Sequence, residues 1–196
     1  IPRTLAASLF GDMDVSTIET MPPGRITPVT TLVKENSFRT VLNDVKNLLV
    51  SGRQLYVICA AVDENEEYHA RNVYDTTESI QTVFPQYKVA CLHGRMSTDE
   101  KQEIMQAFNT NDIQILVSTT VVEVGVNVVN ATGMIIYDAD RFGLSQLHQL
   151  RGRIQRGSEQ GYCWLLTASQ EERVLQRLEV LVRSNNGFEI SYEDLR

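Results

Sequence analysis

Residues 29–61 carry the pattern that decides the fold class, and they read VTTLVKENSFRTVLNDVKNLLVSGRQLYVICAA. Val29–Val33 is predicted to form a strand, and Phe38–Leu49 has the apolar spacing of an amphipathic helix. Leu55–Ala61 is an apolar run of the kind that forms a strand buried on both faces. The stretch therefore predicts a strand, a helix and a second strand in succession.

The same alternation continues toward the C-terminus. Helices are expected over about Tyr68–Val83, Ser97–Phe108 and Ser145–Arg151, and strands over Lys88–Leu92, Ile113–Ser118, Met134–Tyr137 and Tyr162–Leu166. Ser97 followed by Glu100 resembles a capping box, which supports a helix start at that point. Apolar strands that alternate with helices predict an α/β fold of three layers, with a mostly parallel sheet flanked by helices.

Length and composition suggest how the chain is organised. Its 196 residues, 42% of them hydrophobic, suit one ordinary globular domain. Residues 1–28 are predicted to be a connector because they hold four prolines, which fix the backbone and lack an N–H donor. Residues 29–168 are predicted to form the α/β domain. Residues 169–196 form a separate segment, in which Val174, Leu178 and Leu181 give Glu171–Arg183 one apolar stripe.

Composition also argues against several classes of protein. No stretch approaches the roughly 18 apolar residues of a membrane span, and the first residues lack the order of a signal peptide, so we expect a cytoplasmic protein. Neither the cysteines nor the histidines have paired ligand spacing, so buried reduced thiols and no metal site are expected. The formal net charge of -7 argues against a general basic surface, so any DNA contact must be local.

A first candidate site follows the strand that ends near Ser118. In an α/β sheet, ligands gather at the carboxyl ends of the strands. The residues there offer hydroxyls, a glycine and an amide, which suit phosphate or sugar oxygens; they are Ser118, Thr119, Thr120, Gly125 and Asn127. Ordinary turn and cap chemistry is an alternative explanation for the same residues.

A second candidate site is a cluster of arginines between positions 141 and 156. Arg153 and Arg156 are three residues apart, so on a helical turn they project from one side and can grip the oxygens of a phosphoryl group. This is the arrangement of arginine fingers in phosphoryl transfer. Gln149, one turn earlier, could orient the attacking water. The alternative is a solvated helix face.

The sequence lacks the loop that would hold a nucleotide for these arginines. No G-x-x-x-x-G-K-[ST] segment is present, and neither is an acidic strand end of the Walker B kind. We therefore expect that the chain alone does not hydrolyse ATP, and that the fingers act on a nucleotide held by another lobe.

Three segments together resemble the RecG family of superfamily-two helicases. Gln146–Arg153 is similar to motif VI of that family, Ser118–Gly125 is similar to motif V, and Leu92-His93-Gly94-Arg95-Met96 is similar to its short strand-to-helix motif. The resemblance covers nearly the whole chain and implies a RecA-like second motor lobe. It also implies that a first motor lobe precedes residue 1 and that residues 169–196 begin a helical coupling hairpin.

The resemblance implies an ATP-driven translocase on double-stranded DNA that remodels stalled replication forks and branched recombination intermediates in DNA repair. Such a protein is a monomer of the bacterial cytoplasm, with no membrane partner. A wedge domain splits the branched DNA, and ATP with magnesium is held mainly by the first lobe. Related translocases such as the transcription-repair coupling factor, and a degenerate binding module without nucleotide chemistry, are the alternatives.

The resemblance also implies a role for individual residues. Arg153, Arg156 and Gln149 would be catalytic, at the phosphates of the nucleotide. Glu123, Gly125, Asn127 and Gly152 would shape the nucleotide side of the site. Ser118, Thr119, Thr120 and Arg95 would contact DNA. Gln155 departs from the family pattern, which has glycine between the two arginines, and a side chain there bears on the geometry of the fingers.

Overall fold

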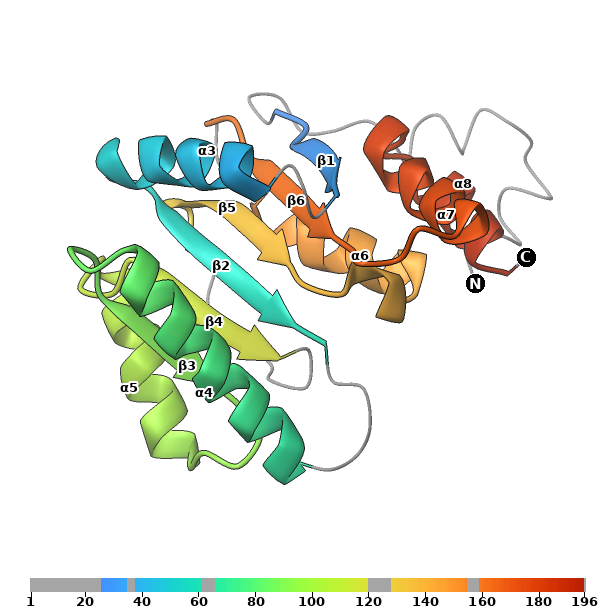
Figure 1. The fold of residues 1–196 in the computed structure, drawn as a ribbon. Helices are drawn as coiled ribbons and strands as arrows, with labels where there is room; N and C mark the ends of the chain where they lie inside the picture. The colour runs from blue at the N-terminus through green and yellow to red at the C-terminus, as the bar shows by residue number, and fades with distance from the viewer. Residues whose placement is uncertain (1–25, 35–37, 61–65, 120–127, 155–158, 196) are drawn as a thin grey trace, which may run out of the picture.

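The computed structural model describes residues 26–34, 38–60, 66–119, 128–154 and 159–195, and Figure 1 shows their arrangement. Within these residues, six strands form one sheet in the order β1-β6-β5-β2-β4-β3, and each neighbouring pair is parallel. The strands are β1 Val29–Val33, β2 Gln54–Cys59, β3 Val89–Leu92, β4 Ile115–Thr119, β5 Ala131–Ile136 and β6 Tyr162–Leu166. The parallel sheet expected from the sequence is confirmed.

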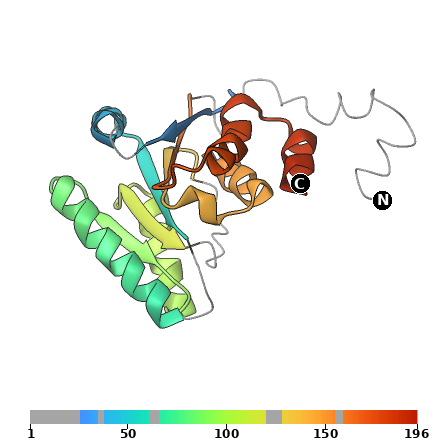
Figure 2. The same ribbon diagram turned by 45° about the vertical axis from the view of Figure 1, so that its right-hand side comes forward.

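Helices cover both faces of the sheet, as Figure 2 shows. The helices are α3 Phe38–Val50, α4 Glu66–Val83, α5 Thr98–Asn109, α6 Leu144–Arg151, α7 Glu172–Arg183 and α8 Gly187–Asp194, with 3-10 turns η2 Ala139–Arg141 and η3 Gly152–Ile154. Side chains of α3 and α4 share one core cluster with Val57 of β2. Side chains of α5, α6, α7 and α8 share the other cluster with Tyr56. Successive residues of a strand point to opposite faces, so each layer of helices packs on its own set of strand side chains.

The expected elements are present, with shifted ends at some of them. β1 and β6 have the predicted bounds, and Ser97 caps α5, where its Oγ accepts the N–H of Glu100 at 3.2 Å. β5 begins at Ala131, three residues before the predicted start. Position 133 lies inside this strand and is occupied by glycine, because a Cβ there would meet Leu48 Cδ1 at 2.8 Å. The glycine thus reflects close packing of α3 on β5.

The last residues form two helices. α7 confirms the predicted helix, whereas the sequence predicted no bounds for α8. α7 packs beside β1, and α8 packs on α6 and α7. Leu178 and Ile190 lie in the same core cluster as Leu147 of α6. The division of the chain at residue 168 stays a prediction.

Burial and hydropathy give two further observations. All three cysteines, at positions 59, 91 and 163, are buried and free, as predicted. Burial raises the pKa of the Cys163 thiol to about 12, which keeps it protonated at neutral pH. None of the helices in the described ranges is both long and apolar enough to cross a bilayer.

Candidate functional site

The carboxyl end of β4 carries the first group of predicted site residues. Ser118 and Thr119 are each 2% exposed. Ser118 Oγ donates to the carbonyl of Thr119 at 3.1 Å, whereas Thr119 Oγ1 has no hydrogen-bond partner among the described residues. A buried hydroxyl without a hydrogen-bond partner costs about 1–3 kcal/mol of folding free energy. A ligand or another segment that bonded to it would recover that energy. Thr120, Glu123, Gly125 and Asn127 lie outside the described residues.

The turn after β3 lies beside this strand end. β3 and β4 are neighbours in the sheet, and Leu92 is in register with Ser118. The next residues, His93–Ser97, connect β3 to α5, and Arg95 is exposed on this turn. The structure therefore brings Arg95 to the same edge of the sheet as Ser118 and Thr119.

The segment with the predicted fingers begins in α6. Gln149 is exposed in the last turn of this helix, which ends at Arg151. Gly152 and half-buried Arg153 continue it as the tighter turn η3. Gln155 and Arg156 lie outside the described residues, so the relative placement of the two fingers stays a prediction.

The finger segment lies away from the carboxyl edge. A Cβ on Gly161, the residue before β6, would meet the carbonyl oxygen of Ile154 at 2.8 Å, so η3 packs against the amino end of that strand. Among the described residues, no atom lies within 4 Å of a Cβ built on Gly152. The structure thus separates the finger segment from Ser118 and Thr119, on one flank of the sheet.

Arg151 has a role that its place in a basic cluster did not reveal. It is 2% exposed, and burial lowers its pKa. Its guanidinium donates to Thr30 Oγ1 at 3.1 Å, and to the carbonyl oxygens of Leu181 at 2.6 Å and Ser184 at 3.0 Å. Two of these acceptors lie at the C-terminal end of α7, where a cation is favourable. Arg151 therefore ties α6 to β1 and α7, and its helical spacing from buried Leu144 and Leu147 was the signal for its burial.

His148 packs beside this guanidinium. Its Nδ1 lies 2.8 Å from Nη2 of Arg151. Burial, and next the charge of Arg151, lower the pKa of His148 to about 4. The imidazole is therefore neutral at physiological pH and accepts a hydrogen bond from the arginine.

The opposite end of α6 is held by α8. Asp194 accepts the backbone N–H of Leu144 at 2.7 Å and that of Ser145 at 3.0 Å. Burial alone would raise the pKa of Asp194, but these N–H donors, the Ser145 hydroxyl and the charge of Arg177 together lower it. A carboxylate at a helix N-terminus stabilises the helix. α8 therefore caps α6.

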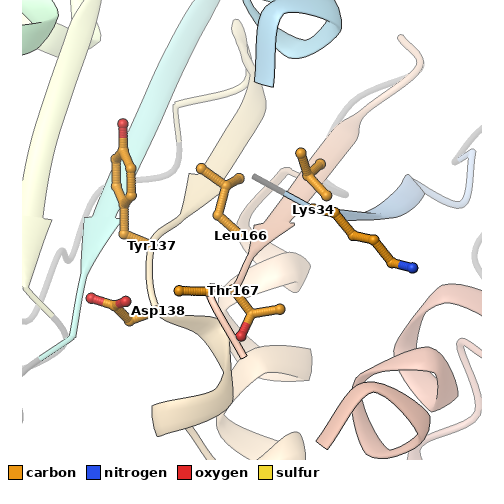
Figure 3. Close-up of a pocket in the computed structure, with 7 residues that line it drawn as sticks. Lys34, Tyr137, Asp138, Leu166 and Thr167 are labelled. Atoms are coloured by element: carbon orange, nitrogen blue, oxygen red, sulfur yellow. The ribbon is translucent and has the colours of Figure 1, made fainter. Parts of the chain in front are cut away.

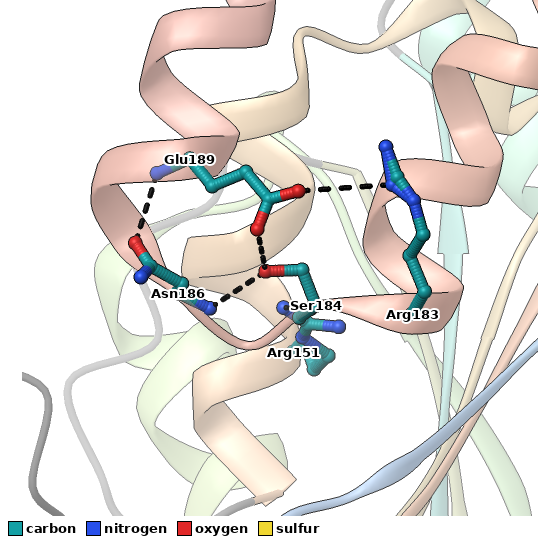
Figure 4. Close-up of polar contacts among 5 residues, drawn as sticks. All are labelled: Arg151, Arg183, Ser184, Asn186 and Glu189. Carbon is teal, nitrogen blue, oxygen red and sulfur yellow. Dashed lines mark hydrogen bonds and ion pairs between the residues drawn. The ribbon is translucent and has the colours of Figure 1, made fainter.

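A polar cluster fixes the turn between α7 and α8, as Figure 4 shows. Ser184 Oγ accepts the N–H of Asn186 and donates to Glu189 Oε2, both at 3.0 Å. Asn186 Oδ1 accepts the N–H of Glu189 at 2.9 Å. Asn186 is thus the N-cap of α8, and the Asn-x-x-Glu spacing was the sequence signal for this helix.

A hollow of about 300 Å³ lies at the carboxyl ends of β1, β5 and β6 (Figure 3). Lys34, Tyr137, Asp138 and Thr167 contribute its polar groups. Asp138 adopts the left-handed conformation, with φ 51°. Burial, and next the neighbouring Cys59, raise the pKa of Tyr137.

The comparisons with known proteins decide the family. The family described as "Helicase conserved C-terminal domain" matches residues 40–158. This chain belongs to the helicase C-terminal domain family. Over 196 residues it is 49% identical to the ATP-dependent DNA helicase RecG of Staphylococcus aureus strain NCTC 8325, and 48% identical to RecG of Staphylococcus epidermidis strain RP62A. Each match covers 100% of this chain and 29% of the relative.

Solved structures agree with this assignment. The helicase lobe superimposes on RecG bound to a three-way DNA junction with a TM-score of 0.77 and 33% identity, over 100% of this chain and 25% of the other. Domain 2 of the DEAD-box helicase Mss116p, bound to an RNA duplex, matches with a TM-score of 0.61 at 16% identity, over 79% of this chain and 59% of that chain. The second match shows the fold alone. The RecA-like fold expected of a helicase C-terminal lobe is confirmed.

The helicase lobe thus presents two separate candidate regions. One is the carboxyl edge, where Ser118, Thr119 and Arg95 lie together. The other is the end of α6, with Gln149, Gly152 and Arg153. α7 and α8 hold α6 at both ends, through Arg151 and Asp194.

Proposed function

We propose that this chain is the second motor lobe of a RecG-like ATP-dependent DNA helicase, which moves along double-stranded DNA and remodels stalled forks and branched recombination intermediates in DNA repair. The observation that carries the proposal is the match to RecG over the full length of the chain, including RecG bound to a three-way junction. Because the chain spans 29% of those relatives, the activity belongs to the whole protein.

The carboxyl edge is the proposed DNA contact of the lobe. Arg95 would pair with a DNA phosphate, and Ser118, Thr119 and Thr120 would lie at the DNA backbone beside it. Thr119 Oγ1, which has no hydrogen-bond partner within the part of the chain that the structure describes, supports this role, because a phosphate oxygen would satisfy it. The net charge of -7 makes a local contact necessary, since the lobe has no overall attraction for DNA.

The end of α6 is the proposed nucleotide contact. Arg153 and Arg156 would hold phosphate oxygens, with Gln149 beside them. Gly152 would let the phosphates approach the backbone, which its open surroundings support. Glu123, Gly125 and Asn127 are proposed to shape the nucleotide side of the motif V loop. ATP with magnesium, held mainly by the first lobe, would supply the phosphoryl group.

Residues 169–196 are proposed to couple nucleotide state to movement on DNA. The contacts that support this are those of Asp194 at the start of α6 and of Arg151 at the end of α7. A displacement of α6 would therefore be passed to both helices of the segment. The other proposed partners are the first lobe and wedge domain of the same protein, working as a monomer in the bacterial cytoplasm.

The test is DNA-stimulated ATP hydrolysis by the full-length protein carrying Arg153→Ala or Arg156→Ala. Loss of an arginine finger lowers turnover by a factor on the order of 1,000. Arg141→Ala is the control. Arg141 belongs to the same cluster of arginines but is exposed in η2, so its substitution should leave turnover unchanged. If both variants kept full turnover, the finger role would be refuted, and the lobe would be a binding module without nucleotide chemistry.

A further inference from the structure

A second hollow, of about 490 Å³, lies between α3 and the amino ends of β5 and β6. The lining side chains that bear on its chemistry are Asp44 of α3, Thr132 of β5, and Tyr162 and Trp164 of β6. All strands of the sheet are parallel, so this hollow and the carboxyl edge lie at opposite ends of the strands. The amino-end hollow is thus separate from the proposed DNA contact.

Two stacked aromatic rings line the amino-end hollow. Tyr162 and Trp164 are two residues apart on β6, so their side chains point to the same face of the sheet. The ring centroids lie 5.9 Å apart, with an angle of 13° between the planes. Trp164 is buried, whereas Tyr162 is 40% exposed. The tyrosine ring is therefore held by its neighbour and open to a ligand, and the face of such a ring attracts cations.

Thr132 adds a hydroxyl to the same hollow. The register between β2 and β5 passes over this residue, since Gln54 pairs with Ala131 and Leu55 pairs with Gly133. An irregularity of this kind turns a side chain away from the regular pleat. Thr132 is 4% exposed and still lines the hollow, and no hydrogen bond joins its hydroxyl to another described residue. A ligand that bonded to this hydroxyl would complete a hydrogen bond that the fold leaves unmade.

The charges around the amino-end hollow favour a cation. Its lining holds two carboxylates, Asp44 and Glu159, and one guanidinium, Arg53, which gives a net charge of -1. Arg53 forms an ion pair with Glu159 at 3.1 Å and donates to Asn130 Oδ1 at 3.2 Å, so its charge is already compensated. The C-terminal end of α3 adds a partial negative charge. A phosphate group would be repelled here, whereas a cation would be attracted.

We propose that the amino-end hollow binds an arginine side chain of a partner protein. A guanidinium is flat, so it stacks on the Tyr162 ring while its N–H groups donate to the Asp44 carboxylate and the Thr132 hydroxyl. The ammonium of a lysine has the charge but not the plane, so arginine is the favoured residue. The inference is independent of the proposed function. A partner held at the amino ends of the strands leaves the carboxyl edge open to DNA.

The test uses the blocked tripeptide acetyl-Gly-Arg-Gly-amide, whose binding to the full-length protein is followed by saturation-transfer NMR. A single side chain supplies few contacts, so we expect a Kd on the order of 1 mM. The same peptide with citrulline in place of arginine keeps the shape and loses the charge, and it should bind at least tenfold more weakly. Equal binding of the two peptides, or no binding of the arginine peptide, would overturn the inference.

Three substitutions place the peptide in the amino-end hollow. Asp44→Asn should raise the Kd roughly threefold, as expected for a partly exposed ion pair. Tyr162→Leu should raise it by a similar factor, because it removes the ring that the guanidinium stacks on. Thr132→Val keeps the shape and removes the hydroxyl, so it should raise the Kd about fivefold. Glu103→Gln is the matched control, since it removes an exposed carboxylate from α5, on the other face of the sheet, and should leave the Kd unchanged.

Asp44→Asn decides the outcome if a buried substitution disturbs the fold, because Asp44 is exposed on α3. An unchanged Kd for Asp44→Asn would overturn the inference. An equal loss for Glu103→Gln would also overturn it, because the attraction would then come from the overall charge of -7. If the tetranucleotide dT4 bound in place of the peptide and Tyr162→Leu weakened it, the hollow would hold a nucleobase, and the partner-protein assignment would be wrong.

Discussion

Gly152→Ala should affect the stability of the lobe and its proposed nucleotide contact in opposite directions. Gly152 has φ -60° and ψ -20°, which any L residue adopts, and a Cβ there would meet no atom of residues 26–34, 38–60, 66–119, 128–154 and 159–195 within 4 Å. Alanine at such a position lowers the entropy of the unfolded chain and stabilises the folded one by about 0.4–1 kcal/mol. Urea denaturation of the 196-residue chain, followed by circular dichroism, should show this gain.

The same substitution should impair ATP hydrolysis by the full-length protein. If the phosphates approach the backbone at Gly152, the added methyl group displaces them, and we expect at least a tenfold loss of turnover. Tenfold corresponds to about 1.4 kcal/mol of transition-state stabilisation. Turnover is measured with saturating three-way junction DNA over a range of ATP concentrations. A variant with unchanged kcat and KM would show that nothing comes within reach of a methyl group at Gly152.

Three further substitutions probe the surroundings of α6 by urea denaturation. Gly161→Ala should destabilise the chain by about 1–3 kcal/mol, because its Cβ would overlap the carbonyl oxygen of Ile154; a stable variant would mean that η3 packs elsewhere. Asp194→Asn should cost about 1 kcal/mol at pH 7 through the weakened cap of α6, and an unchanged stability would contradict the cap. Because the pKa of His148 is lowered, its side chain binds a proton near pH 6.5 in the unfolded chain but only near pH 4 in the folded chain. The unfolded chain therefore binds more protons between these values, and the free energy of unfolding should fall by on the order of 2 kcal/mol as the pH drops from 6.5 to 4. His148→Asn should remove that part of the pH dependence, and an identical profile would contradict it.

The sequence predicted the layers of the lobe because its strands and helices have clear apolar periods. The strand in Val29–Val33 and the capped helix after Ser97 are examples in which local signals agree with the fold. β5 was placed three residues late, since Thr132 and Gly133 gave no apolar signal, and the glycine is explained by its close contacts with Leu48 and Leu55. Close packing between distant elements has no local signal.

The candidate site was predictable to a similar extent. The position of Ser118 and Thr119 at the carboxyl edge follows from the parallel sheet. The burial of Arg151 and the amino-end hollow depend on residues from distant parts of the chain, such as Ser184 and Asp44. The cap of α6 by Asp194 likewise joins residues that are 50 positions apart in sequence.

The central claim is that this lobe takes part in ATP hydrolysis only together with a first lobe. The most direct measurement compares ATP turnover by the purified 196-residue chain with turnover by the full-length protein, both with three-way junction DNA. We predict turnover that DNA stimulates in the full-length protein, and none above buffer for the chain alone. ATP hydrolysis by the isolated chain, or a full-length protein without DNA-stimulated turnover, would contradict the claim.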